Sequence, residues 1–170
     1  EDLPFESDAF DTTLSVFGAM FAPDQQRTAD ELVRVTRPGG TIGLAAWTPD
    51  GFIGQMFKVV GARVAPPAGV PSPLLWGTNS HLLHLFGTSY TSLRSVQHEC
   101  VWRFASAEEF VDYFRRWYGP VLKAFESLDT RQQKLLAADL VDLANEWDSK
   151  KDDGSIAIPA AYLESLIKLR

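Results

Sequence analysis

The sequence contains a single cysteine, Cys100, among its 170 residues. One cysteine excludes a disulfide within the chain and a metal centre built from several cysteines. This scarcity is typical of a reducing compartment, so we expect a cytoplasmic protein. The sequence also lacks an apolar run approaching the roughly 18 residues that a membrane span requires. Its first residues are acidic, so we expect no signal peptide.

Basic residues do not outnumber acidic ones: 16 Lys and Arg stand against 22 Asp and Glu, and the formal net charge is -6. Nucleic-acid binding needs a basic surface that neutralises phosphates, so we do not expect nucleic acid as a partner. Hydrophobic residues make up 45% and aromatic residues 12% of the chain. These fractions and the length indicate one globular domain whose bulky side chains are buried or line a pocket.

The first 50 residues predict a strand, a helix and a second strand. Thr12–Phe17 is rich in β-branched and aromatic residues, which is typical of a buried strand. Asp24 begins a helix with apolar residues on one side, and Pro38 in the sequence Arg37–Gly40 marks its end. Thr41–Trp47 predicts the next buried strand. A short helical crossover of this kind places two strands parallel and adjacent in an α/β sheet.

Farther along the chain, the patterns predict several helices and two more sheet segments. Helices are expected at Phe52–Val64, at residues 81–86, at residues 107–119 after the capping box Ser106–Glu109, and at Asp129–Trp147. A long strand is expected at Leu93–Phe104. Val96, His98, Cys100, Trp102 and Phe104 are expected on the better-buried face of that strand. Ser155–Arg170 fits a strand or a helix equally well. The helices between residues 105 and 148 look like an insertion between two strands.

Three stretches near the start of the chain resemble one enzyme family. They are DLPF at Asp2–Phe5, FDTTLSVFGAMFAPD at Phe10–Asp24 and ELVRVTRPGGTIGLAAWTPDGF at Glu31–Phe52. In this order and spacing they resemble class I S-adenosylmethionine-dependent methyltransferases of the group that acts on small molecules. The Pro-Gly-Gly turn alone would not be specific, because many helix-to-strand connections use it.

The resemblance implies an α/β fold, the Rossmann-like methyltransferase sheet with strand order 3-2-1-4-5-7-6 and an antiparallel last strand. Thr12–Phe17 would be the fourth strand, Thr41–Trp47 the fifth, Leu93–Phe104 the sixth and Ser155–Arg170 the seventh. We therefore expect residues 1–170 to form a partial methyltransferase domain with strands in the order 4-5-7-6. Its sheet core would comprise residues 1–50, 88–104 and 155–170, and its helical acceptor-side elements residues 52–87 and 105–150.

The chain departs from the family in the part that holds most of the cofactor. It lacks the glycine-rich loop after the first strand and the acidic residue that binds the ribose. The acidic residue for adenine falls before residue 1 or is replaced by Glu1. The resemblance implies three remaining contacts to S-adenosylmethionine in this chain. Leu3 would lie against the adenine, and Ser15 and Phe17 near the methionine end. The alternative is that these three only pack, and we expect weak or absent cofactor binding by this chain alone.

Aromatic residues supply the candidates for the methyl acceptor. Trp47, Phe52, Trp76 and Trp117 could form an apolar acceptor pocket, and core packing is the alternative for each. No catalytic residue is identified: His81, His84 and His98 are the possible bases by pKa, and His98 is expected to be a core histidine. His81 and His84 stand one helical turn apart without a third ligand, so we expect no metal site.

These observations predict methyl transfer from S-adenosylmethionine to a small molecule in the intact protein, with this fragment inactive alone. The alternatives are a non-catalytic dimeric binding or scaffold module derived from a methyltransferase, and a small-molecule binder that transfers no methyl group. The absence of three strands would leave Thr12–Phe17 as an apolar sheet edge. We therefore expect self-association through residues 12–17, or completion by a separate N-terminal piece. No membrane partner is expected, and the sequence names neither the acceptor nor its methylated atom.

Overall fold

The computed structural model describes residues 1–150 and 155–170 of the chain. Its strands are β1 (Phe10–Val16), β2 (Thr36–Trp47), β3 (Tyr90–Phe104) and β4 (Ile156–Leu169). Its α-helices are α1 (Gln25–Val35), α2 (Phe52–Gly61), α3 (Asn79–Phe86), α4 (Ala107–Trp117), α5 (Gly119–Ser127) and α6 (Thr130–Glu146). The 3-10 helices η1 (Ala19–Phe21) and η2 (Pro73–Gly77) complete the described elements.

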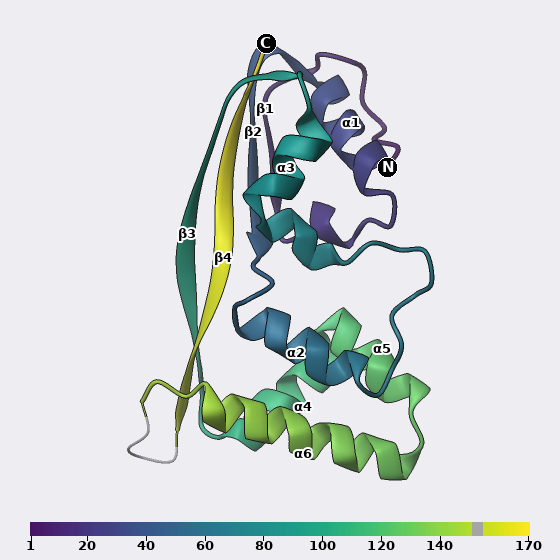
Figure 1. The fold of residues 1–170 in the computed structure, drawn as a ribbon, viewed down its shortest axis with the longest axis vertical. Coiled ribbons are helices and arrows are strands. Elements are labelled where there is room, and N and C mark those ends of the chain that lie inside the picture. The colour runs from purple at the N-terminus through teal and green to yellow at the C-terminus, as the bar shows by residue number, and fades with distance from the viewer. Residues whose placement is uncertain (151–154) are drawn as a thin grey trace. The chain divides into compact units, whose positions relative to one another are not determined.

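The four strands of the described chain form one sheet in the order β1-β2-β4-β3 (Figure 1). β1 and β2 are parallel and α1 connects them, as the sequence predicts. β4 pairs antiparallel with β2, so the ambiguous segment Ser155–Arg170 is a strand, and Pro159 does not interrupt it. The predicted order 4-5-7-6 is confirmed, and α4, α5 and α6 lie between β3 and β4 in the chain as the predicted insertion.

The described chain divides into two compact units. Unit 1 comprises residues 1–49, 69–98 and 161–170 and holds β1, β2, α1, α3, η1 and η2. Unit 2 comprises residues 50–68 and 99–160 and holds α2, α4, α5 and α6. β3 and β4 each contribute a part to both units. Each unit has a core of its own, with Ile42 and Leu44 buried in unit 1 and Phe110 and Leu140 buried in unit 2.

Three of the α-helices, α1, α4 and α6, begin at capping residues where the sequence predicts a helix start. Asp24, Ser106 and Asp129 each accept a hydrogen bond from the backbone N–H three residues farther on, at 3.0, 3.2 and 2.8 Å. These bonds satisfy donors that the first helical turn leaves without a partner. Gly87 ends α3 with a φ of 50°, which glycine adopts without strain. None of the helices in the described part is long and apolar enough to cross a bilayer.

β2 begins at Thr36, earlier than the predicted start at Thr41. α1 ends before Pro38 as expected, but the residues after it do not form a simple turn. The register between β1 and β2 shifts at this point, so residues 37–40 form a bulge within the strand. Gly40 permits this bulge, because a Cβ atom there would lie only 3.0 Å from the carbonyl oxygen of Asp11.

β3 does not bury the face that its alternation predicts. Val96 is 49% exposed, the side chain of His98 is 42% exposed and Cys100 is exposed. β3 is an edge strand, and on its opposite face the hydroxyls of Ser95 and Ser165 are hydrogen bonded at 2.8 Å. The predictions of a buried face at residues 96–100 and of a core histidine at position 98 are therefore wrong. Alternation establishes the period of a strand but does not determine which face another element covers.

One face of the sheet in unit 1 is covered and the other is open. Ile42 and Leu44 are 0% and 5% exposed, and α1 and α3 lie along one side of β1 and β2 (Figure 1). Side chains of the opposite parity lie on the other face: Leu14 and Val16 are 69% and 68% exposed, and Leu166 is 48% exposed. β1 is the last strand at its end of the described sheet, so both its outer edge and this face are accessible.

Gly77 allows η2 to pack directly against the carboxyl end of β2. A Cβ atom at this position would lie 2.1 Å from the carbonyl oxygen of Trp47 and 2.9 Å from the Cα of Thr48. We expect Gly77→Ala to lower the free energy of unfolding by about 1–3 kcal/mol, because the backbone of η2 or of the end of β2 must shift. Urea unfolding measures this change.

The matched control is Gly61→Ala at the end of α2, where a Cβ atom would meet nothing within 4 Å. Alanine there should stabilise the protein by up to about 1 kcal/mol, since glycine is a poor helix residue. Equal stability of Gly77→Ala and the unsubstituted protein would contradict the close packing of η2 on β2.

Candidate functional site

The carboxyl end of β1 has an unusual backbone conformation at Phe17. Its φ is 53°, a left-handed value that is uncommon for a residue with a bulky side chain. Two hydrogen bonds hold this turn. The N–H of Phe17 donates to the carbonyl of Ala45 at 2.9 Å, and the N–H of Ala19 donates to the hydroxyl of Ser15 at 2.8 Å. Strained residues of this kind cluster at ligand sites, where the surrounding structure compensates for their cost.

Phe17 stacks on Trp47 at the carboxyl end of β2. The two rings are 4.0 Å apart between centroids and nearly parallel, with an interplanar angle of 15°. Tyr162 of β4 meets both rings edge-on, at 5.6 Å from Phe17 and 6.2 Å from Trp47. Because β1 and β2 are parallel, their carboxyl ends reach the same edge of the sheet, where α/β proteins bind ligands. The structure thus brings together Phe17, predicted for the cofactor, and Trp47, predicted for the acceptor.

Tyr162 is a residue that sequence reasoning missed, and it extends the aromatic cluster toward β3. Its partner in the ladder is Trp47, an antiparallel pairing that no local pattern reveals. His98 follows: its ring centroid is 5.5 Å from that of Tyr162, and its Nε2 is 3.6 Å from a carboxylate oxygen of Glu164. His98, half exposed and beside an acid, is therefore placed next to the aromatic cluster of Phe17, Trp47 and Tyr162.

Leu3 lies apart from the strand ends, in a segment that packs on α1. Its N–H donates to Glu31 at 2.7 Å, and its carbonyl accepts from Arg34 at 3.1 Å. The hydrogen bonds from Arg34 and from Leu3 lower the pKa of Glu31 from 4.5 to about 2. Sequence reasoning did not single out Glu31 or Arg34, although both belong to the family-like stretch ELVR. Their i, i+3 spacing on a helix was the available signal.

Trp76, another predicted acceptor residue, is buried in unit 1. It is 1% exposed, and its indole N–H has no hydrogen-bond acceptor among the described residues. Trp76 is next to Gly77, whose backbone packs against the end of β2 at Trp47. Trp47 and Trp76 therefore belong to neighbouring elements of unit 1. A buried donor without an acceptor is costly, and an oxygen atom of a bound molecule would satisfy the indole N–H of Trp76.

Phe52 and Trp117, the other two predicted acceptor residues, belong to unit 2. Phe52 is fully buried and meets Phe110 and Trp147 at centroid distances of 5.4 and 5.9 Å. Trp117 is 73% exposed at the end of α4. Phe52 thus packs within the core of unit 2, and Trp117 lies on its surface.

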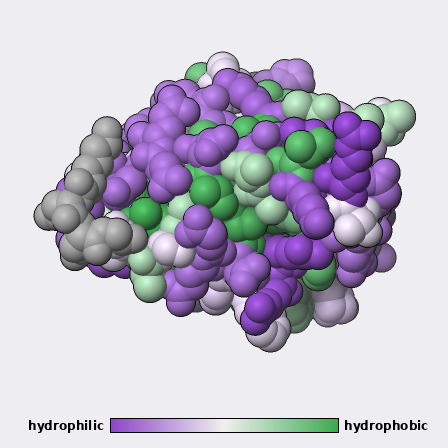
Figure 2. Space-filling model, turned by 90° about the horizontal axis from the view of Figure 1, so that it is seen from below, coloured by the Kyte–Doolittle hydropathy of each residue, from purple (hydrophilic) through white to green (hydrophobic). Residues whose placement is uncertain are grey.

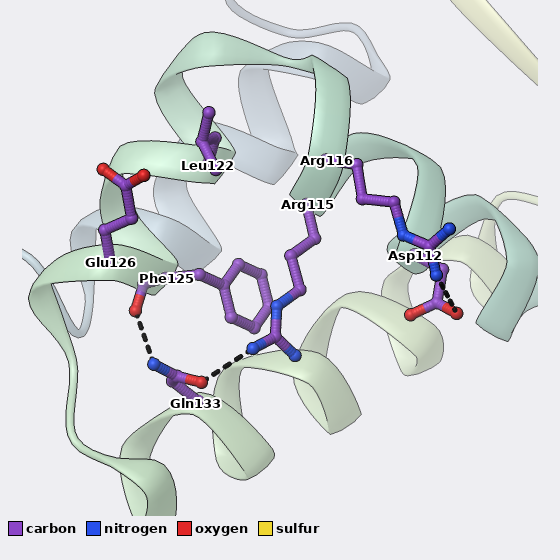
Figure 3. A pocket seen from close by; sticks show the side chains of 7 residues that line it. All are labelled: Asp112, Arg115, Arg116, Leu122, Phe125, Glu126 and Gln133. Atoms are coloured by element: carbon purple, nitrogen blue, oxygen red, sulfur yellow. Dashed lines mark hydrogen bonds and ion pairs between the residues drawn. The ribbon is translucent and has the colours of Figure 1, made fainter.

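Unit 2 also has an open hollow between α4, α5 and α6 (Figure 3). Its volume is about 540 Å³. In it, the guanidinium of Arg115 lies 4.7 Å from the ring centre of Phe125 and donates to Gln133 at 2.8 Å. None of the four predicted acceptor residues lines this hollow. Seen from below, the surface is mostly polar, and apolar side chains are visible among the polar ones (Figure 2).

His81 and His84 lie on α3 with ring centroids 6.3 Å apart. His81 Nε2 is 2.7 Å from the side-chain oxygen of Gln25, whose amide nitrogen donates to the carbonyl of Ser72. This arrangement requires the proton on His81 Nε2, and burial, followed by the nearby His84, lowers the pKa of His81. In the described part of the chain, no group of three or more His, Cys, Asp or Glu residues could hold a metal ion.

Comparison with known proteins relates these features to one family. Residues 1–44 match the family model of the methyltransferase domain. An uncharacterized protein of Mycobacterium tuberculosis H37Rv is 40% identical over 158 residues, which cover 86% of this chain and 58% of that protein. A second uncharacterized protein of this strain is 38% identical over 151 residues, which cover 86% of this chain and 55% of that protein. The chain thus spans less than two thirds of the length of these curated relatives.

Solved structures show the same fold at low sequence identity. A Bacillus halodurans C-125 protein assigned as a methyltransferase has a TM-score of 0.55 at 13% identity, covering 98% of this chain and 73% of that one. An Anabaena variabilis protein with the same assignment has a TM-score of 0.56 at 14% identity, covering 99% and 70%. Together with the family match, these structures confirm the predicted resemblance to class I methyltransferases and the Rossmann-like fold class.

The backbone strain at Phe17 can be measured with two substitutions. Phe17→Ala and Phe17→Gly both remove the ring that stacks on Trp47, but only glycine relieves the left-handed backbone. We expect Phe17→Gly to be more stable than Phe17→Ala by about 1 kcal/mol in urea unfolding. The matched pair Leu14→Ala and Leu14→Gly, in the extended part of β1, should show the opposite order. Alanine more stable than glycine at both positions would contradict strain at Phe17.

Proposed function

We propose that this chain is the acceptor-side part of a class I methyltransferase that transfers a methyl group from S-adenosylmethionine to a small molecule. The observation that carries the proposal is the meeting of Phe17 and Trp47 where two parallel strands end, within a methyltransferase fold. Residues 1–44, which include Phe17, match the methyltransferase domain. The single cysteine fits a reducing, cytoplasmic location for this activity.

The residues at the strand ends suit the cofactor because they form a rigid apolar wall. S-adenosylmethionine, when bound, supplies the electrophilic methyl group. Its transfer is an in-line displacement, which depends on alignment and on exclusion of water more than on a protein nucleophile. Phe17, fixed by the hydrogen bond to Ala45, would exclude water beside the donor, and Trp47 would present the acceptor from the neighbouring strand. The unsatisfied indole N–H of Trp76 would orient an acceptor that carries an oxygen atom.

The full-length protein should bind S-adenosylmethionine and transfer its methyl group, and the isolated chain should bind it weakly or not at all. The reason is that the resemblance assigns most cofactor contacts to a glycine-rich loop and a ribose-binding acid, and we expect both outside the residues of this chain. Isothermal titration of both proteins with S-adenosylmethionine measures the affinities. Incubation with the donor labelled in its methyl group and a panel of small acceptors measures transfer.

Each outcome of this experiment separates the proposal from its alternative. Binding and transfer by the full-length protein support a methyltransferase. A folded full-length protein that binds no S-adenosylmethionine contradicts the proposal and favours a non-catalytic binding or scaffold module. Tight binding by the isolated chain contradicts the view that cofactor binding depends on segments outside residues 1–170.

We also propose that the isolated chain associates with a second copy through β1, whose outer edge and apolar residues Leu14 and Val16 are exposed. Leu14→Lys should shift the sedimentation of a concentrated sample toward the monomer, because a charge on this strand opposes pairing. Leu83→Lys, at a 46% exposed position on α3, is the control and should leave association unchanged. A monomeric unsubstituted chain at high concentration would rule out this association.

A further inference from the structure

The segment that precedes β1 is held against α1 along the whole length of this helix. At the first turn, the Glu1 carboxylate accepts the N–H of Asp24 at 2.6 Å, and the Glu1 carbonyl accepts a hydrogen bond from Arg27. At the last turn, the carbonyl of Arg34 accepts the N–H of Asp8 at 2.9 Å. The position of this segment is therefore determined by polar contacts with α1.

Within these contacts, the Glu31–Arg34 pair forms hydrogen bonds with the backbone of Leu3 and Phe5. Glu31 accepts the N–H of Leu3, and Arg34 donates to the carbonyls of Leu3 at 3.1 Å and Phe5 at 2.8 Å. Arg34 also donates to both carboxylate oxygens of Glu31, at 2.6 and 2.8 Å. All three guanidinium nitrogens are used, so the planar fork fixes two backbone positions and the acid together.

Partial burial and opposite charges stabilise the ion pair of Glu31 and Arg34. The side chains of Glu31 and Arg34 are 14% and 33% exposed, and their bonds to the segment join residues about 30 positions apart in the chain. The pKa of Glu31 is lowered from 4.5 to about 2, so the carboxylate is charged at all pH values above that range. Its stabilising contribution is present above the unfolded pKa and is lost only as the pH falls toward 2.

We propose that Glu31 and Arg34 are positioning residues that hold the Leu3–Phe5 backbone as the adenine-side wall of the S-adenosylmethionine site. The inference rests on the proposed function and on the contact of Leu3 with the adenine that the family resemblance implies. Both backbone polar groups of Leu3 are already bonded to the Glu31–Arg34 pair. Leu3 can therefore offer the ligand only its apolar side chain, and the accuracy of that contact depends on how firmly α1 holds the backbone.

The test uses Arg34→Lys in the full-length protein. Lysine keeps the positive charge, but its compact ammonium cannot reproduce the bonds that the planar guanidinium makes to Glu31, Leu3 and Phe5. We expect about tenfold weaker binding of S-adenosylmethionine in isothermal titration, the effect of losing one to two charge-assisted hydrogen bonds. The KM for the methyl acceptor should not change. Hydrogen exchange of the amides in residues 2–8 should become faster, a readout that needs no cofactor.

Arg37→Lys is the matched control, because Arg37 forms its ion pair with the exposed Asp11, outside residues 1–8. It should bind S-adenosylmethionine like the unsubstituted protein. Unchanged affinity and exchange in Arg34→Lys would overturn the positioning role while leaving the proposed function intact. A fall in melting temperature and kcat without a selective loss of cofactor affinity would also overturn it. Absence of binding by the unsubstituted protein would contradict the proposed function itself.

Discussion

The parallel pairing of β1 and β2 is the interaction on which the candidate site depends. It aligns the two strands so that their carboxyl ends, and with them Phe17 and Trp47, reach one edge of the sheet. A parallel pair requires a crossover, and α1 provides it. The bulge at residues 37–40 absorbs the extra length between the end of α1 and the regular ladder, so the register at the functional end is preserved.

α1 has a second role beyond closing this crossover. Its inward side chains Leu32 and Val35 are buried, and its other side holds the segment at residues 1–8 through Glu31 and Arg34. One helix therefore links the wall proposed for the adenine to the sheet that carries Phe17. The polar contacts to residues 1–8 therefore come from a helix, α1, whereas the proposed ligand would meet mainly apolar side chains.

The aromatic residues serve different physical purposes in the two units. In unit 2, Phe52 meets Phe110 and Trp147 within the core, an ordinary use of bulky side chains. In unit 1, Phe17 stacks on Trp47 and has a strained, left-handed backbone conformation. The indole N–H of Trp76 is buried and has no hydrogen-bond acceptor in the described chain. Strain and an unsatisfied donor distinguish a candidate binding wall from a core more clearly than aromatic content does.

The sequence by itself determined the strand–helix–strand unit, the helix starts at Asp24, Ser106 and Asp129, and the family resemblance, because these depend on local periodicity, capping and spacing. Tertiary structure alone decided which face of β3 is open, that residues 37–40 bulge, and that Tyr162 and His98 join Phe17 and Trp47. These features depend on contacts between separate strands, or on what covers a face. Local patterns carry no information about either, since a strand alternates in the same way whichever side is buried.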